Sequence, residues 1–318
     1  MDLTERILSG DRRAIAQAIS MVEDGAEGLA EISAELYAHT GRAYTVGLTG
    51  SPGVGKSTLA GALVGHARQL GLTVAVLAVD PTSPFSGGAL LGDRLRMQEH
   101  ATDPGVFIRS MATRGHLGGM ALAAPEAVRI LDAAGADLVI VETVGVGQAE
   151  VEVAAATDTT LVVVSPGWGD AVQVAKAGIL EVADVFVVNK ADRDGASAAV
   201  RDLEQMIRMG PPLDWAPPVV STCATTGAGV RELWEAIARH RQHAEATGRI
   251  EERRRERLVR EVAALAGERI RELVRRRLEA DRALVEELVH RRTDPITAAA
   301  TLVAGVASTE AGEPRVEL

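Results

Sequence analysis

Apolar and polar positions follow three different patterns along the chain, and the pattern changes near residues 42 and 249. Residues 1–41 place apolar side chains at helical spacing with breaks at Gly10 and Gly25, which predicts a helical N-terminal extension. Residues 42–248 alternate short β-branched runs with Ala-rich stretches. Residues 249–318 begin with a charged run, after which apolar residues recur mostly every three to five positions. This last pattern predicts an amphipathic helical arm followed by a C-terminal tail.

The middle segment predicts a mostly parallel β-sheet with helices on both faces. Its β-branched runs are continuous rather than alternating, and they lie at residues 45–48, 73–79, 106–108, 138–141, 160–164, 185–188 and 219–221. Uninterrupted apolar strands separated by helical stretches are typical of a parallel sheet that is buried on both sides. The expected fold class is therefore α/β, with the helical extension before the sheet domain and the helical arm after it.

Composition and charge exclude several classes of protein. The chain of 318 residues has a formal net charge of −10, which argues against nucleic acid as a partner because non-specific binding needs a basic face. Cys223 is the only cysteine, so neither a disulfide within the chain nor a thiolate cluster can form. The first residues lack the order of a signal peptide, and no apolar run approaches the ~20 residues that span a bilayer. We expect no membrane segment and a cytoplasmic location.

A phosphate-binding loop is predicted directly after the first strand. Residues 50–57 have the sequence G-S-P-G-V-G-K-S, and a helical stretch follows them, which is the context that this motif requires. Glycines let backbone N–H groups surround the phosphates, while Lys56 supplies charge to the β and γ oxygens and the Ser57 hydroxyl ligates Mg²⁺. The predicted phosphate-binding residues are Gly50, Ser51, Pro52, Gly53, Val54, Gly55, Lys56, Ser57 and Thr58.

Three carboxylates are candidates for the same magnesium site. Glu142 ends the apolar run 138–141 and opens E-T-V-G, so its carboxylate can reach the metal while the Gly145 N–H meets the γ-phosphate. Asp80 also follows a strand, although an Asx-turn at the following proline is an alternative role. Asp93 lies in a Gly-rich stretch, where capping of a helix near residue 94 is the alternative. Lys56, Glu142 and Gly145 are the predicted catalytic residues.

A guanine-binding motif follows the run 185–188. Asn189, Lys190 and Asp192 form N-K-A-D, and the Asp192 carboxylate can accept from both N1–H and N2–H of guanine, whereas adenine offers no such pair of donors. Asn189 is expected to tie this loop to the phosphate loop. After the last strand, the backbone at Cys223 and Ala224 can donate to guanine O6, and Cys223 is expected to be a small buried thiol. The two motifs predict a P-loop GTPase domain over residues 42–248 that uses GTP, GDP and Mg²⁺.

The histidines give no sign of a metal-delivery protein. They are scattered, and only His240 and His243 are spaced to share one face of a helix, where we expect them to face solvent. The residue that positions the attacking water stays open. Val146 cannot orient water as a glutamine can, and Gln148 is one candidate.

Five motifs together resemble one family. They lie at residues 47–58, 79–83, 87–97, 114–119 and 142–148, and they are similar to those of the MeaB/ArgK-type GTPases, chaperones of adenosylcobalamin-dependent methylmalonyl-CoA mutase. The resemblance implies a homodimer made by the C-terminal arm, Mg²⁺ near Ser57, Asp80, Asp93 and Glu142, and slow hydrolysis that a partner accelerates. One departure is Cys223, because Ser-Ala is more usual in the family than Cys-Ala.

The resemblance implies a GTP-hydrolysing chaperone that gates cofactor loading and protection of a cobalamin-dependent acyl-CoA mutase, and it leaves the particular mutase open. The alternative function is a nucleotide-dependent protein kinase that acts on a transport component, a label attached to similar sequences. No phosphoacceptor-recognition motif supports the kinase, and N-K-A-D favours GTP where a kinase ordinarily uses ATP.

Overall fold

The computed structural model describes residues 1–81, 97–113, 120–143, 153, 155–167 and 182–310. The chain divides into two compact units, Met1–Arg257 and Leu258–Leu318, and the predicted nucleotide motifs all belong to the first. Among the helices of the described residues, none combines the length and the apolar composition that crossing a membrane requires.

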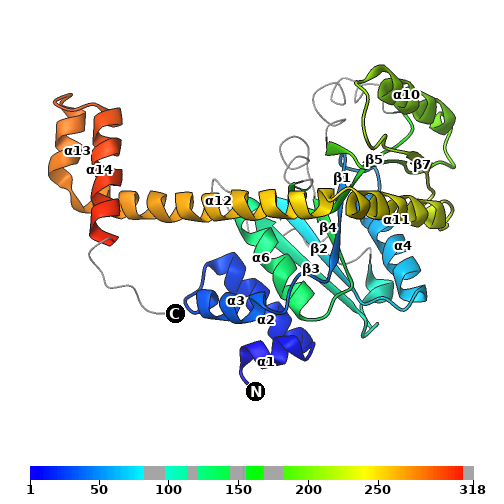
Figure 1. Cartoon of the computed structure of the whole chain (residues 1–318), viewed down its shortest axis with the longest axis horizontal. Helices are drawn as coiled ribbons and strands as arrows, with labels where there is room; N and C mark the ends of the chain where they lie inside the picture. The colour runs from blue at the N-terminus through cyan, green and yellow to red at the C-terminus, as the bar shows by residue number, and fades with distance from the viewer. Residues whose placement is uncertain (82–96, 114–119, 144–152, 154, 168–181, 311–318) are drawn as a thin grey trace. The chain divides into compact units, whose positions relative to one another are not determined.

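A seven-stranded sheet forms the centre of the first unit, in the order β3-β2-β4-β1-β5-β6-β7 (Figure 1). Every neighbouring pair of strands is parallel. The strands are β1 (Tyr44–Thr49), β2 (Val74–Pro81), β3 (Val106–Thr113), β4 (Leu138–Thr143), β5 (Thr159–Val164), β6 (Val185–Val188) and β7 (Val219–Ser221). This parallel sheet with helices around it confirms the α/β fold class that the continuous apolar runs predict.

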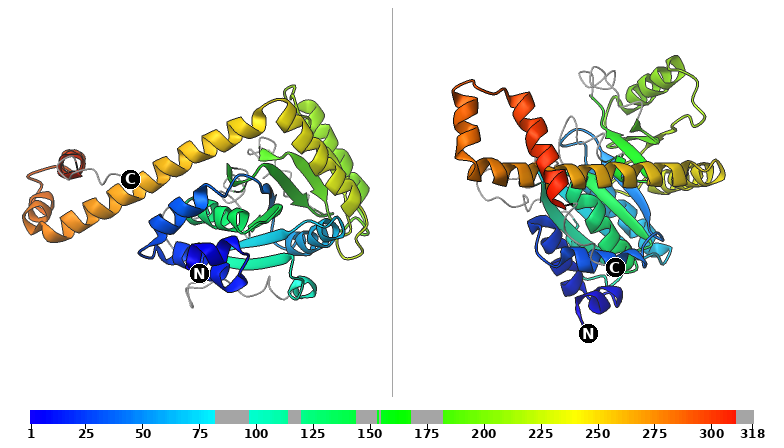
Figure 2. Two further views of the ribbon diagram at one scale, coloured as in Figure 1. Left: turned by 60° about the horizontal axis from the view of Figure 1, so that its bottom comes forward. Right: turned by 60° about the vertical axis from the view of Figure 1, so that its left-hand side comes forward.

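Helices cover both faces of the sheet, as Figures 1 and 2 show. On one face, α4 (Lys56–Gln69) and α11 (Val230–Ala246) pack on alternate residues of the central strands, such as Val46 and Ile140. On the other face, α6 (Met120–Ala133) packs on the residues between them, such as Val139. A smaller cluster lies beneath α10 (Ala196–Met209) beside β6. Burial on both faces explains why the strands are apolar throughout.

The N-terminal helices belong to this first unit. They are α1 (Leu3–Leu8), α2 (Arg12–Asp24) and α3 (Leu29–Tyr37), and their apolar residues share one core cluster with α6. The Asp11 carboxylate caps α2 by accepting from the backbone N–H groups of Arg13 and Ala14. Gly25 ends α2 in the left-handed conformation at φ 59°, which explains the break in the apolar pattern there. A 3-10 turn, η1 (Gln98–His100), precedes β3.

The predicted arm is helical as far as residue 310, and the last residues of the predicted tail, 311–318, lie outside the described part of the chain. It contains α12 (Arg249–Ala280), α13 (Arg282–Val289) and α14 (Pro295–Glu310). The first turns of α12 belong to the first compact unit and the remainder to the second. Within the second unit, Ala298 and Leu302 of α14 are buried, and an Arg277 guanidinium N–H donates to the Leu302 carbonyl at 3.4 Å.

Candidate functional site

The loop after β1 is packed so closely that only glycine fits at two of its positions. Gly50 has φ 137°, and a Cβ there would lie 2.1 Å from the Val163 carbonyl oxygen of β5. Gly55 has φ 96°, and a Cβ there would lie 2.5 Å from Nδ2 of Asn189. Both values are below any contact that a real Cβ makes, and positive φ disfavours other residues as well. The loop is therefore held between β5 and the Asn189 loop, and α4 begins at its end.

Lys56 and Ser57, the first residues of α4, are buried with their polar groups turned toward the loop and the sheet. The Lys56 ammonium donates to the carbonyls of Gly50 at 2.6 Å and Ser51 at 3.2 Å. The Ser57 hydroxyl donates to Oε1 of Glu142 at 2.7 Å. Glu142 lies at the end of β4 with an exposed fraction of 1%, and its backbone pairs with Leu48 of β1. The structure thus brings two of the four predicted magnesium residues into direct contact.

The other predicted metal and catalytic residues are placed only in part. Asp80 lies in β2, and Ala78 of that strand is opposite Glu142 of β4. The Asp80 backbone is therefore two residues further toward the carboxyl edge of the sheet, where the phosphate loop also begins. Its side chain lies outside the described part of the structure, as do Asp93 and Gly145 as a whole.

Asn189 connects its own loop to the phosphate loop, as expected, and also to the loop after β7, which the sequence did not indicate. Its Nδ2 donates to the Val54 carbonyl of the phosphate loop at 2.9 Å. Its Oδ1 accepts from the Thr222 hydroxyl at 3.2 Å and from the Ala224 N–H at 3.1 Å. Because one buried amide satisfies all three contacts, the phosphate loop and the loop after β7 are fixed relative to each other.

A pocket opens where these loops meet. It is lined by Gly55, Thr58, Asn189, Lys190, Asp192, Arg193, Cys223, Ala224 and Thr225. Lys190 has a left-handed backbone at φ 58°, and its ammonium donates to the Gly53 carbonyl of the phosphate loop. Strained non-glycine residues of this kind are concentrated at functional sites. The lining residues include the candidates from N-K-A-D and from the loop after β7.

The rim of this pocket carries an ionised carboxylate. A hydrogen bond with the Cys223 thiol, helped by the backbone and nearby cations, lowers the pKa of the exposed Asp192 carboxyl. The thiol itself is buried, in accordance with the sequence, and its Sγ lies 3.4 Å from the Thr225 hydroxyl. Cys223 thus lines the same pocket as the predicted guanine-binding residue Asp192, although the two residues are distant in the chain.

The expectation that His240 faces solvent is wrong. Its exposed fraction is 3%, its Nδ1 lies 2.7 Å from the Thr159 hydroxyl, and its Nε2 lies 3.1 Å from Oδ1 of Asp184. The Trp215 ring packs against both His240 and His243 at centroid distances of 5.2 Å. Helical spacing puts the two histidines on one face of α11, but only the tertiary fold shows that this face covers the sheet. Asp184 directly precedes the apolar run 185–188, and an acidic residue at this position is the sequence feature that indicates a buried partner such as His240.

Comparison with known proteins agrees with this geometry. Residues 15–279 match the family described as methylmalonyl Co-A mutase-associated GTPase MeaB. A putative GTPase of Pyrococcus abyssi is 49% identical over 308 residues, 94% of each chain, and GTPase ArgK of Escherichia coli is 38% identical over 263 residues, 80% of each chain. The crystal structure of a LAO/AO transport system kinase superposes with a TM-score of 0.71 at 28% identity, covering 96% of each chain. This chain therefore belongs to the MeaB family of P-loop GTPases, which bind guanine nucleotides and hydrolyse GTP.

Proposed function

We propose that this chain is a GTP-hydrolysing chaperone that gates cofactor loading and protection of an adenosylcobalamin-dependent acyl-CoA mutase of the methylmalonyl-CoA mutase type. The observation that carries the proposal is the match of residues 15–279 to a family described as mutase-associated. This range contains both nucleotide loops and most of α12, so the resemblance extends well beyond the phosphate-binding motif.

The two loops support a specific orientation of GTP. Phosphates placed at the N-terminus of α4 would meet backbone N–H groups, the positive end of the helix dipole and the Lys56 ammonium. The base would enter the pocket between Lys190 and Cys223, with the Asp192 carboxylate accepting from guanine N1–H and N2–H. An Asp carboxyl is ionised near neutral pH, and the groups around Asp192 lower its pKa further, so it can accept both hydrogen bonds.

Ser57 and Glu142 fit Mg²⁺. Both offer hard oxygen ligands, and the 2.7 Å contact between them places these oxygens at one point beside the phosphate loop. Within the described residues, no group of three or more His, Cys, Asp or Glu side chains suits a metal. Phosphate oxygens and water would supply further ligands. Bound Mg²⁺ would neutralise charge on the β and γ oxygens. By resemblance, Asp80 and Asp93 also belong to this site, and the Gly145 N–H would contact the γ-phosphate.

Substitution Glu142→Gln tests the metal assignment. The amide keeps an oxygen that can accept from the Ser57 hydroxyl, but it removes the negative charge. We expect GTP hydrolysis at limiting Mg²⁺ to fall about 10- to 100-fold, the usual effect of changing a partner of a metal ligand, while the affinity for guanine is retained. Phosphate release measured across a Mg²⁺ titration gives the result. Exposed Glu204 on α10 provides the matched control, Glu204→Gln, and the same Mg²⁺ dependence in both variants would refute the assignment.

A protein kinase is the second candidate, because a structurally similar protein is named LAO/AO transport system kinase. The two functions differ in the fate of the γ-phosphate. A kinase transfers labelled phosphate to protein, whereas the proposed chaperone releases it to water, at a rate that changes when apo-mutase is added. Release without protein labelling, together with a mutase-dependent rate, is the expected result. Stoichiometric labelling of an added protein would favour the kinase.

A homodimer through the second compact unit is also part of the proposal. Helices α12 to α14 expose large apolar side chains that an isolated chain would leave in water: Leu258, Val259, Val262, Leu265, Ile270, Val285, Val289, Ile296 and Val303. Burial against a second copy would remove this surface from solvent, and two-fold dimers are the commonest closed assemblies.

Removing residues 258–318 should produce a monomer that still binds GDP. The sequence boundary suggests a cut before Arg249, but that cut would strip buried Asp158 and Asp184 of the α12 arginines that pair with them. A cut after Arg257 keeps those pairs and coincides with the boundary between the compact units. Light scattering at micromolar concentration gives the mass of both proteins. A full-length chain that is already monomeric under these conditions would contradict the dimer.

A further inference from the structure

Two buried carboxylates lie at the amino ends of adjacent strands, far from the nucleotide loops. Asp158 directly precedes β5 and Asp184 directly precedes β6, with exposed fractions of 1% and 4%. An ionised carboxylate at this depth is strongly destabilising unless cations and hydrogen bonds compensate it. The groups that compensate these two charges therefore hold defined positions at this end of the sheet.

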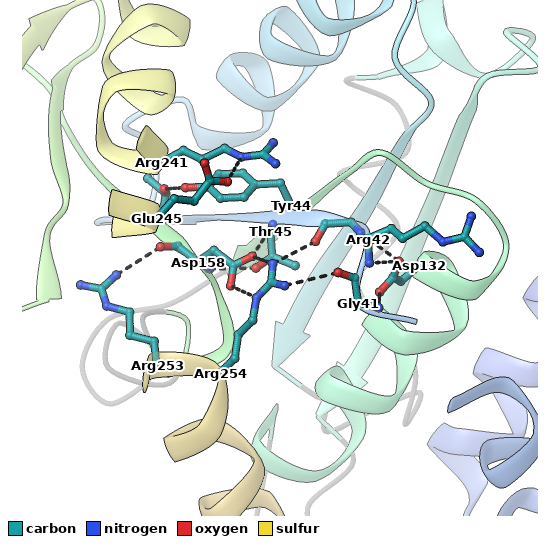
Figure 3. A network of polar contacts seen from close by, with 12 residues as sticks. Gly41, Arg42, Tyr44, Thr45, Asp132, Asp158, Arg241, Glu245, Arg253 and Arg254 are labelled. Carbon is teal, nitrogen blue, oxygen red and sulfur yellow. Dashed lines mark hydrogen bonds and ion pairs between the residues drawn. The ribbon is translucent and has the colours of Figure 1, made fainter. Parts of the chain in front are cut away.

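The first turns of α12 supply these partners, and Figure 3 shows Arg253 and Arg254 of this helix at Asp158. Arg254 donates to both oxygens of Asp158 at 2.8 and 3.1 Å, and Arg257 donates to the same carboxylate at 3.2 Å. Arg253 binds both oxygens of Asp184 at 2.8 Å each. Burial by itself would raise the pKa of both carboxyl groups. At Asp158, hydrogen bonds and charge from Arg254 and Arg257 outweigh burial and lower the pKa. At Asp184, His240 and Arg253 have the same effect and lower the pKa. These pairs are thus ionised and geometrically specific.

The same carboxylates also hold the strands to one another. Oδ2 of Asp158 accepts from the Thr45 N–H of β1 at 3.1 Å, while the Asp158 N–H donates to the Thr45 hydroxyl at 2.8 Å. Oδ2 of Asp184 accepts from the Thr160 N–H of β5 at 2.8 Å. Each carboxylate therefore bonds both an α12 arginine and a strand backbone. The first turns of α12, residues 249–257, which we call the root of α12, are thus fixed together with the register of β1, β5 and β6.

These three strands carry the nucleotide loops at their opposite ends. The phosphate loop follows β1, and its Gly50 lies against the Val163 carbonyl of β5. Asn189 follows β6, and its N–H donates to the Val164 carbonyl at 2.8 Å. The phosphate loop and the Asn189 loop are therefore connected to the carboxylates that bind α12 through the hydrogen-bonded strands β1, β5 and β6.

We propose that Arg253, Arg254 and Arg257 are positioning residues for the nucleotide site, and that the root of α12 and the two nucleotide loops stabilise each other through β1, β5 and β6. The inference rests on the nucleotide site proposed above. Nucleotide binding orders the loops, and the strands transmit this order to the arginine contacts without any change of fold. Such coupling is reciprocal. If bound nucleotide stabilises the arginine contacts by a given factor, loss of these contacts weakens nucleotide binding by the same factor.

Hydrogen exchange in the full-length protein tests this directly. GDP should slow amide exchange in residues 249–262 by at least about fivefold, the lower end of typical coupling between sites. Arg254→Gln should abolish this protection and lower GDP affinity at least about fivefold, whereas Arg254→Lys, which keeps the charge but not the two-pronged geometry, should restore it in part. Arg275→Gln is the matched control, because Arg275 lies on the same helix and pairs, in the described part of the chain, with Glu272 and Glu279 of that helix rather than with a buried strand-end carboxylate.

A double variant separates coupling from simple loss of folding. Arg254→Gln alone leaves Asp158 as a buried, undercompensated charge, and such a charge destabilises the fold whether or not the coupling exists. Asp158→Asn with Arg254→Gln removes the charge, while the amide oxygen still accepts from the Thr45 N–H. This double variant should fold and should still lose the GDP-dependent protection. Protection equal to that of the parent chain, or no protection by GDP in a parent chain that binds it, would overturn the coupling. A parent chain that binds no GDP would overturn the nucleotide site itself.

Discussion

Lys56→Ala is expected to weaken binding of GTP and GDP by about 10- to 150-fold. In the proposed site the substitution would remove a charge-assisted contact with the phosphates, worth roughly 1.5–3 kcal/mol, and a difference of about 1.4 kcal/mol corresponds to a factor of ten in affinity. Lys56 is buried at the start of α4, and its ammonium already lies at the loop, bonded to the Gly50 and Ser51 carbonyls. No rearrangement of the helix is needed for it to reach a phosphate.

Titration calorimetry with GDP and with a non-hydrolysable GTP analogue measures this loss. The control is Arg208→Ala, which also removes one positive charge but from the exposed surface of α10, and it should leave both affinities unchanged. Circular dichroism spectra that match the parent chain would show that Lys56→Ala still folds. Unchanged GDP affinity in a folded Lys56→Ala protein would disprove the role of this lysine.

Asp192→Asn is expected to change which base the protein prefers. The unmodified chain should bind GTP far better than ATP, because in the proposed site the carboxylate would accept two hydrogen bonds that guanine can donate and adenine cannot. Each hydrogen bond to a charged group contributes about 1.5–3 kcal/mol, so the variant should lose more than tenfold in GTP affinity. Xanthine carries a carbonyl in place of the guanine N2 amine, and an asparagine amide can donate to it. The variant should therefore prefer xanthosine triphosphate over GTP.

Competition among GTP, ATP and xanthosine triphosphate for a fluorescent guanine nucleotide gives these preferences. Asp194→Asn is the matched control, since Asp194 is exposed, lies two residues further along and does not line the pocket. Its selectivity should equal that of the parent chain. Equal ATP and GTP affinity in the parent chain, or a retained preference for GTP in Asp192→Asn, would rule out the assignment of the base site.

Local sequence patterns predict the sheet and the two nucleotide loops because neighbouring residues in the chain determine these structures. The glycines at residues 50, 53 and 55 permit backbone angles that other residues disfavour, and each loop directly follows a continuous apolar run. The contact between Ser57 and Glu142 was also predictable, since parallel strands β1 and β4 end at the same edge of the sheet. Residues that are near each other in sequence, or at equivalent ends of parallel strands, can thus be placed together without a structure.

The root of α12 could not be predicted in this way. Arg254 and Asp158 are 96 positions apart, and nothing in the charged run that opens α12 distinguishes the arginines that bind buried carboxylates from those that face water. His240 was assigned to the surface for the same reason, because periodicity identifies a face of a helix but not what the face covers. Buried ion pairs depend on tertiary structure, and their sequence signal is only an acidic residue placed just before an apolar strand.

The proposed function requires that the nucleotide state of this GTPase governs its interaction with a cobalamin-dependent acyl-CoA mutase. A partner can respond to the switch only if its affinity differs between the two states. The most direct measurement is calorimetric titration of an adenosylcobalamin-dependent methylmalonyl-CoA mutase with the full-length protein, loaded either with GDP or with a non-hydrolysable GTP analogue. We predict binding whose affinity differs at least about fivefold between the two states. Absence of binding in both states, or equal affinity in both, would contradict the proposed function.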